Sequence, residues 1–191
     1  KPIIISVQPG QWPQPSIVNT ILSAITSQYR VDSARIYLTG LSMGGWTVDT
    51  YVSENETYAN KIAAVVAVQP AGMDNPVSQM STFASAGGKW WGIRGINDVW
   101  GTEVPTIVTN MNSLSPGSAR GTTVASGQPG STHCCWNTFY DPVTWATNSS
   151  NSYSESIYEW MLKQSKNFNQ APTISFDPIT INLSANVVDT D

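Results

Sequence analysis

Three residue types in this chain could together activate a serine for attack on a carbonyl group. Ser42 lies in the middle of Gly40-Leu41-Ser42-Met43-Gly44, a G-x-S-x-G pattern. A serine hydroxyl is a weak nucleophile near neutral pH and needs a base within hydrogen-bond reach. His133 is the only histidine, and it lies in a loop rich in glycine and serine, so it is the candidate base. A glycine-rich turn with a chance serine would give the same five residues, and the flanking elements decide between the two interpretations.

A carboxylate has to orient the imidazole and stabilise its charged form. Asp98 follows a predicted strand, and it lies between Ser42 and His133 in the sequence. This reproduces the Ser…Asp…His order of one hydrolase architecture and excludes two other common orders. Asp74, which follows the preceding predicted strand, is the alternative acid. Asp141 lies too close to His133 in the sequence to approach the imidazole easily from its far side.

The residues around Ser42 predict the sharp strand-to-helix turn on which such a serine has to sit. An apolar run over 35–39 is rich in β-forming residues, and a helix-compatible run follows over 43–53. On such a turn, side chains two residues before and two residues after the serine would collide, which explains the two glycines of the pattern. The backbone N–H of Met43, at the start of the new helix, would then face the developing oxyanion.

Strand-like and helix-like segments alternate along the chain, which predicts a doubly wound, mostly parallel α/β sheet. In such a sheet, residues that directly follow the strands meet at one edge, where ligands bind. Ser42, Asp98 and His133 each follow a predicted strand and should meet at this edge. The predicted strands cover 3–7, 35–39, 62–68, 90–95 and 121–125, and the predicted helices cover 17–29, 43–53, 78–86, 102–114 and 153–163.

The composition argues against several classes of partner. Only 12% of the 191 residues are charged, and the net charge is −4 without a basic cluster, so neither nucleic acid nor an anionic membrane is an expected partner. No apolar run approaches the roughly 20 residues that a membrane-spanning helix needs. The polarity comes from Ser, Thr and Asn instead, which is typical of secreted proteins.

The two cysteines, Cys134 and Cys135, are adjacent in the sequence. Neighbouring cysteines can join only through an eight-membered ring, so two small buried thiols are the favoured interpretation and a vicinal disulfide is the rarer one. With a single histidine and no second cysteine pair, a metal site is not expected. Nothing in the sequence predicts a cofactor.

The chain has eight tryptophans, and their positions suggest two different roles. Trp90, Trp91 and Trp160 lie within predicted strands and helices and are assigned to the core. Three others fall in loops at the predicted catalytic edge, where aromatic rings could line an acyl or aryl pocket: Trp12, Trp100 and Trp136.

Three segments resemble motifs of secreted α/β-hydrolases related to polyhydroxybutyrate depolymerases, feruloyl and acetylxylan esterases, and predicted peptidases. Residues 35–45 (RIYLTGLSMGG) look like the nucleophile elbow of this group. Residues 91–98 (WGIRGIND) are similar to its W-x-x-H-G-x-x-D strand and acid loop. His133-Cys134-Cys135-Trp136 resembles its G-H-x-x-W base loop. The resemblance covers roughly residues 1–165.

The resemblance implies an α/β-hydrolase fold with Ser42 as nucleophile, Asp98 as acid and His133 as base. It also implies a secreted, extracellular, bacterial carboxylic-ester hydrolase that acts on small or polymeric esters, such as polyesters or the acyl and feruloyl esters of plant polysaccharides. Two other functions stay open: a serine peptidase on the same triad, and a non-catalytic polymer-binding module on a degenerate hydrolase fold. The specific substrate and the oligomeric state do not follow from the sequence.

The sequence departs from the family pattern in two places. Arg94 stands where the family usually has a histidine, at a position outside the triad. The family's second oxyanion donor comes from a His-Gly loop after an earlier strand, and this sequence contains no His-Gly. The chain also begins, at Lys1, inside an apolar run, which predicts a sheet that lacks its N-terminal strands. We therefore expect a partial catalytic domain over 1–168. Residues 169–191 are expected to form a linker and the start of a β domain that resembles an Ig-like repeat, and a disordered tail is the alternative.

Overall fold

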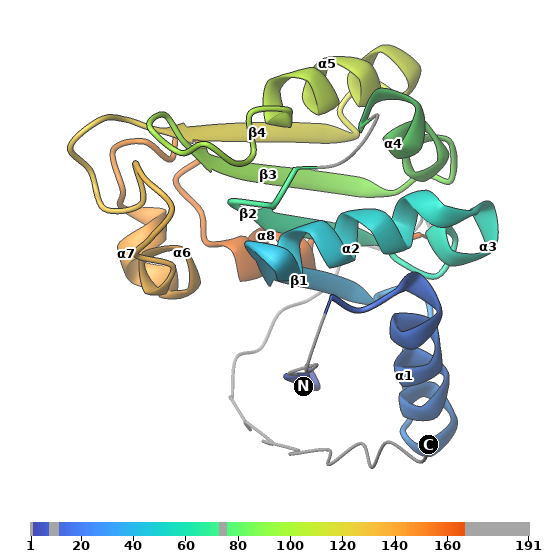
Figure 1. Cartoon of the computed structure of the whole chain (residues 1–191). Helices are drawn as coiled ribbons and strands as arrows, with labels where there is room; N and C mark the ends of the chain where they lie inside the picture. The colour runs from blue at the N-terminus through green and yellow to red at the C-terminus, as the bar shows by residue number, and fades with distance from the viewer. Residues whose placement is uncertain (1, 8–11, 73–75, 167–191) are drawn as a thin grey trace.

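The computed structural model of the chain describes residues 2–7, 12–72 and 76–166. Within this part of the chain, four parallel strands form one sheet in the order β1-β2-β3-β4 (Figure 1). In-register partners run across the whole sheet, from Gly40 through Ala67 and Gly92 to Gly121. The bounds of the strands are β1 Tyr37–Leu41, β2 Ala64–Val68, β3 Lys89–Gly95 and β4 Ala119–Val124.

Helices connect each strand to the next, as parallel strands require. Four of the five predicted strands and the five predicted helices are present with ends shifted by a few residues, and α3, α6 and α7 are additional short helices. The fold class is therefore α/β, with an all-parallel sheet flanked by helices. The helices are α1 Pro15–Gln28, α2 Met43–Glu54, α3 Glu56–Ala59, α4 Pro76–Ser85, α5 Val104–Leu114, α6 Asn137–Tyr140, α7 Pro142–Ala146 and α8 Ile157–Leu162.

Both faces of the sheet are covered, and the alternation along each strand assigns side chains to one face or the other. Val65 of β2 and Trp90 of β3 pack with α2, α4 and α5 on one face. Val66 and Trp91, their neighbours in the sequence, pack with α6, α7 and α8 on the opposite face. All five residues of β2 are fully buried, which is why this strand reads as an uninterrupted apolar run.

The strand predicted over 3–7 is wrong. Residues 2–7 form no strand, and Ile3, Ile4 and Val7 are each between 44% and 50% exposed. An apolar run becomes a strand only where its N–H and C=O groups pair with a neighbour, and none of the described strands pairs with this segment. The segment 169–191, predicted as a linker and a β domain, lies outside the described residues.

Candidate active site

Ser42 sits on a sharp turn between β1 and α2. Its φ of 52° and ψ of −118° are unusual for a non-glycine residue, and its N–H donates to the carbonyl of Val68 over 2.9 Å. A Cβ added at Gly40 would fall on the carbonyl group of Gly44, so the predicted collision is present on that side. It is absent at Gly44 itself, where a Cβ would meet nothing within 4 Å. The second close approach belongs to Gly45, whose Cβ would meet the Cα of Pro70 at 2.8 Å.

The structure brings Ser42, His133 and Asp98 into one hydrogen-bonded chain. His133 Nε2 lies 2.8 Å from Ser42 Oγ, and His133 Nδ1 lies 2.9 Å from Asp98 Oδ2. An ionised carboxylate can only accept, so it selects the tautomer with the proton on Nδ1. Nε2 is then free to accept the proton of the serine hydroxyl. The arrangement can therefore raise the nucleophilicity of Ser42 and stabilise an imidazolium.

Asp98 is held in place from several directions. Its side chain is completely buried, whereas the His133 side chain keeps 26% of its surface exposed. The backbone N–H of Trp100 donates to Asp98 Oδ1 over 2.9 Å, so each carboxylate oxygen has a partner. Of the other acids considered, Asp74 lies outside the described residues. Asp141 caps α7 by accepting the Thr144 N–H, and this hydrogen bonding lowers its pKa.

The candidate oxyanion donor is the backbone N–H of Met43. Met43 is the first residue of α2, so its N–H has no acceptor within the helix. It directly follows Ser42 at the positive end of a twelve-residue helix, where partial negative charge is stabilised. The sequence contains no His-Gly loop that could supply a second donor, because its only histidine is His133, which is followed by Cys134.

The three loop tryptophans differ in how they relate to His133, Asp98 and Ser42. The ring of Trp136 meets the His133 imidazole edge-on at 5.4 Å. Trp100 follows Asp98 by two residues and is 48% exposed. Trp12 is 51% exposed and packs edge-on, at 5.0 Å, against Trp46 in the first turn of α2. The tryptophans assigned to the core are buried, namely Trp90, Trp91 and Trp160.

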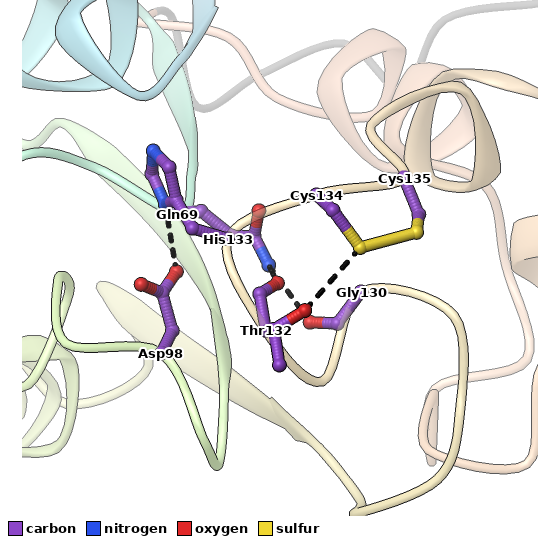
Figure 2. Close-up of a disulfide and its surroundings, with 7 residues drawn as sticks. All are labelled: Gln69, Asp98, Gly130, Thr132, His133, Cys134 and Cys135. Atoms are coloured by element: carbon purple, nitrogen blue, oxygen red, sulfur yellow. Dashed lines mark hydrogen bonds and ion pairs between the residues drawn. A yellow bond between two sulfur atoms is a disulfide. The ribbon is translucent and has the colours of Figure 1, made fainter.

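Two features next to His133 differ from or go beyond what the sequence predicts. Cys134 and Cys135 form a vicinal disulfide (Figure 2), so the favoured interpretation as two thiols is wrong. Cys135 has a φ of 62°, a local backbone conformation that sequence pattern alone does not reveal. Gln69 was also missed, although it is fully buried and contacts the loop that carries His133. Its only signal in the sequence is a polar residue at the end of an otherwise apolar strand.

Within the described residues, no group of three or more His, Cys, Asp or Glu side chains could hold a metal ion. In the same part of the chain, no helix is both long enough and apolar enough to cross a bilayer. The chain matches no protein-family model. A comparison with curated proteins likewise gave no significant match.

Proposed function

We propose that this chain is a serine hydrolase of the α/β-hydrolase type that cleaves carboxylic esters through an acyl-enzyme. The observation that carries the proposal is the continuous relay from Ser42 Oγ to His133 Nε2 and from His133 Nδ1 to Asp98 Oδ2, with both distances below 3 Å. Nucleophile, base and orienting acid are recognised by this geometry and not by their order in the chain.

In the proposed reaction, Ser42 Oγ attacks the ester carbonyl carbon while its proton passes to His133 Nε2. The carbonyl oxygen becomes an oxyanion, towards which the Met43 N–H donates. When the tetrahedral intermediate collapses, the alcohol leaves with the proton from Nε2, and the acyl group stays on Ser42. Water then attacks the acyl carbon while it gives a proton to His133 Nε2. When this second tetrahedral intermediate collapses, the bond to Ser42 Oγ breaks, Nε2 returns the proton to Oγ, and the acid leaves.

Two observations favour an ester over a peptide as the substrate, and a third supports an extracellular location. Only one oxyanion donor is identified, and an ester makes the smaller demand on it because an alcohol is expelled more easily than an amine. Trp100, two residues after Asp98, and Trp12, which packs against Trp46 in the first turn of α2, are half-exposed and offer apolar surface to an acyl or aryl group. The disulfide between Cys134 and Cys135 is of a kind that persists in oxidising compartments, which supports secretion.

The test is active-site labelling of the whole chain with a fluorophosphonate probe. We expect a single label, located on Ser42 by mass spectrometry. Ser42→Ala should lose the label and about a thousandfold or more of the hydrolysis of short p-nitrophenyl esters. Ser154→Ala is the matched control, because Ser154 is the other described serine with a positive φ (52°) and should leave labelling unchanged.

An unlabelled wild-type protein that is folded would refute the proposal and favour a non-catalytic binding module. Faster hydrolysis of a peptide amide than of the matching ester, with Ser42 labelled, would assign the triad to a peptidase instead.

A further inference from the structure

Gln69 directly follows β2 and occupies an unusual position for a glutamine. It is fully buried, with a φ of 44°, and its backbone N–H donates to the carbonyl of Ile93 over 2.6 Å. β2 is the strand beside the elbow strand β1, and the Ser42 N–H bonds to the last residue of β2, Val68. Gln69 therefore lies at the same edge of the sheet as the triad.

The side chain of Gln69 reaches the loop that carries His133 (Figure 2). Its Nε2 donates to the carbonyl of Gly130 over 2.7 Å and to the carbonyl of Thr132 over 2.6 Å. The second of these carbonyls belongs to the residue directly before His133. One buried amide group thus joins the core strand to both ends of a three-residue segment that leads into the base.

The pattern of hydrogen bonds argues against a purely structural role for this glutamine. Its Oε1 is buried and has no hydrogen-bond partner among the described residues, so the side chain carries a desolvation penalty that nothing offsets. Methionine has a similar length and would fill the same space without that penalty. What methionine lacks is two N–H donors on one atom.

Other contacts near His133 are local to the loop or hold its middle residue. The backbone N–H of Cys134 donates to the carbonyl of Thr132 over 2.8 Å, which is a bond within the loop and does not tie it to the sheet. The backbone N–H of Asn97 donates to the carbonyl of Ser131 over 2.8 Å, and the backbone of Gly95 lies against the same carbonyl. These contacts hold Ser131, which lies between the two carbonyls that Gln69 binds. The imidazole meanwhile has to reach Ser42 and Asp98 at the same time.

We infer that Gln69 is a positioning residue that holds the base loop, so that His133 can bind Asp98 and Ser42 together. The inference rests on the proposed function for its catalytic consequence, but the placement of His133 can be measured without turnover. Because His133 is the only histidine, every imidazole signal in an NMR spectrum belongs to it.

The experiment compares the wild type with Gln69→Met in the whole chain. We expect Gln69→Met to fold. It should react with the fluorophosphonate probe roughly 10 to 100 times more slowly than the wild type, as a misplaced catalytic group does. It should also lose the downfield NMR resonance of the proton between His133 Nδ1 and Asp98. Asn151→Leu is the matched control. Asn151 is also a buried amide whose single nitrogen donates to two carbonyls, those of Trp145 and Glu155, each over 2.9 Å.

Asn151→Leu should lower the midpoint of thermal unfolding and leave the His133 resonances unchanged. If Gln69→Met behaves in the same way, Gln69 is structural only and the inference is overturned. A wild type that shows the downfield resonance but does not label would refute the proposed hydrolase while leaving the placement of His133 by Gln69 testable by NMR.

Gln69→Glu provides a second, independent readout and decides the question if Gln69→Met does not fold. A protonated glutamic acid can donate one hydrogen bond to the loop, whereas its carboxylate would face two carbonyl oxygens. We expect its labelling rate, divided by that of the wild type at each pH, to rise as the pH falls. A ratio that does not change with pH would overturn the inference.

Discussion

Asp49 is an acid placed where its charge is poorly tolerated. It lies in α2 and is fully buried, and its Oδ1 accepts the indole N–H of Trp90 over 2.7 Å. Its Oδ2 has no hydrogen-bond partner among the described residues. Burial raises the pKa of Asp49 from 3.8 to about 8; the Trp90 hydrogen bond lowers it in part, and the nearby charge of Glu103 raises it further.

The raised pKa makes the stability of the fold depend on pH. Between about pH 4 and about pH 8 the folded chain holds the Asp49 proton and the unfolded chain does not, so the free energy of unfolding falls as the pH rises through this window. At about 1.4 kcal/mol per pH unit, this group removes about 4 kcal/mol between about pH 5 and about pH 8. Asp49→Asn keeps an acceptor for Trp90 and cannot ionise. Relative to the wild type, its free energy of unfolding should therefore rise by about 4 kcal/mol over the same interval.

Urea unfolding at several pH values, followed by tryptophan fluorescence, measures this difference. Lys166, whose pKa burial lowers to about 8, titrates in the same window but is present in both proteins and cancels. Asp32→Asn is the control, because the hydrogen bond from Arg35 lowers the pKa of the exposed Asp32 and confines its effect to pH values below about 4. Parallel pH dependences of the wild type and Asp49→Asn would show that Asp49 is ionised in the folded protein and refute the reasoning.

Two further predictions concern the elbow and the disulfide. Gly40→Ala should lower the free energy of unfolding by about 3 kcal/mol or more, because its Cβ would overlap the Gly44 carbonyl group. Gly44→Ala should be neutral or stabilise α2 by about 1 kcal/mol, because a Cβ there meets nothing. Thermal unfolding of the two variants measures the difference, and equal losses of stability would contradict the geometry. Reduction of Cys134–Cys135 with a dithiol should slow ester hydrolysis by about 10- to 100-fold, because the pair directly follows His133, and reoxidation should restore the rate. If the reduced protein shows two titratable thiols per chain and an unchanged rate of ester hydrolysis, the disulfide does not contribute to the site.

Much of this arrangement can be predicted from short stretches of sequence. The elbow is local, because strand, turn and helix all lie within 35–53, and a strand-to-helix turn of this kind requires glycine at Gly40. The position of Asp98 follows from a general rule, since residues after parallel strands share one edge. The same rule places the loop after β4, and therefore His133, near Ser42.

The features that the sequence does not predict depend on contacts between distant segments. Ile3–Val7 has strand composition, but composition does not show whether a neighbouring strand is available for pairing. Gln69 donates to residues 61 and 63 positions away, and neither partner carries a motif. The vicinal disulfide depends on the backbone conformation at Cys135, which residue types do not determine.

The backbone gives an argument for the site that is independent of any motif. Four non-glycine residues in the described part of the chain have a positive φ, and three of them, Ser42, Gln69 and Cys135, belong to the elbow, to the end of the adjacent strand and to the base loop. Such conformations cost of order 1–3 kcal/mol each and persist only where the surrounding structure enforces them. Random strain would scatter over the loops. The gathering of three such residues around His133 therefore supports the proposal that this edge of the sheet is a functional site.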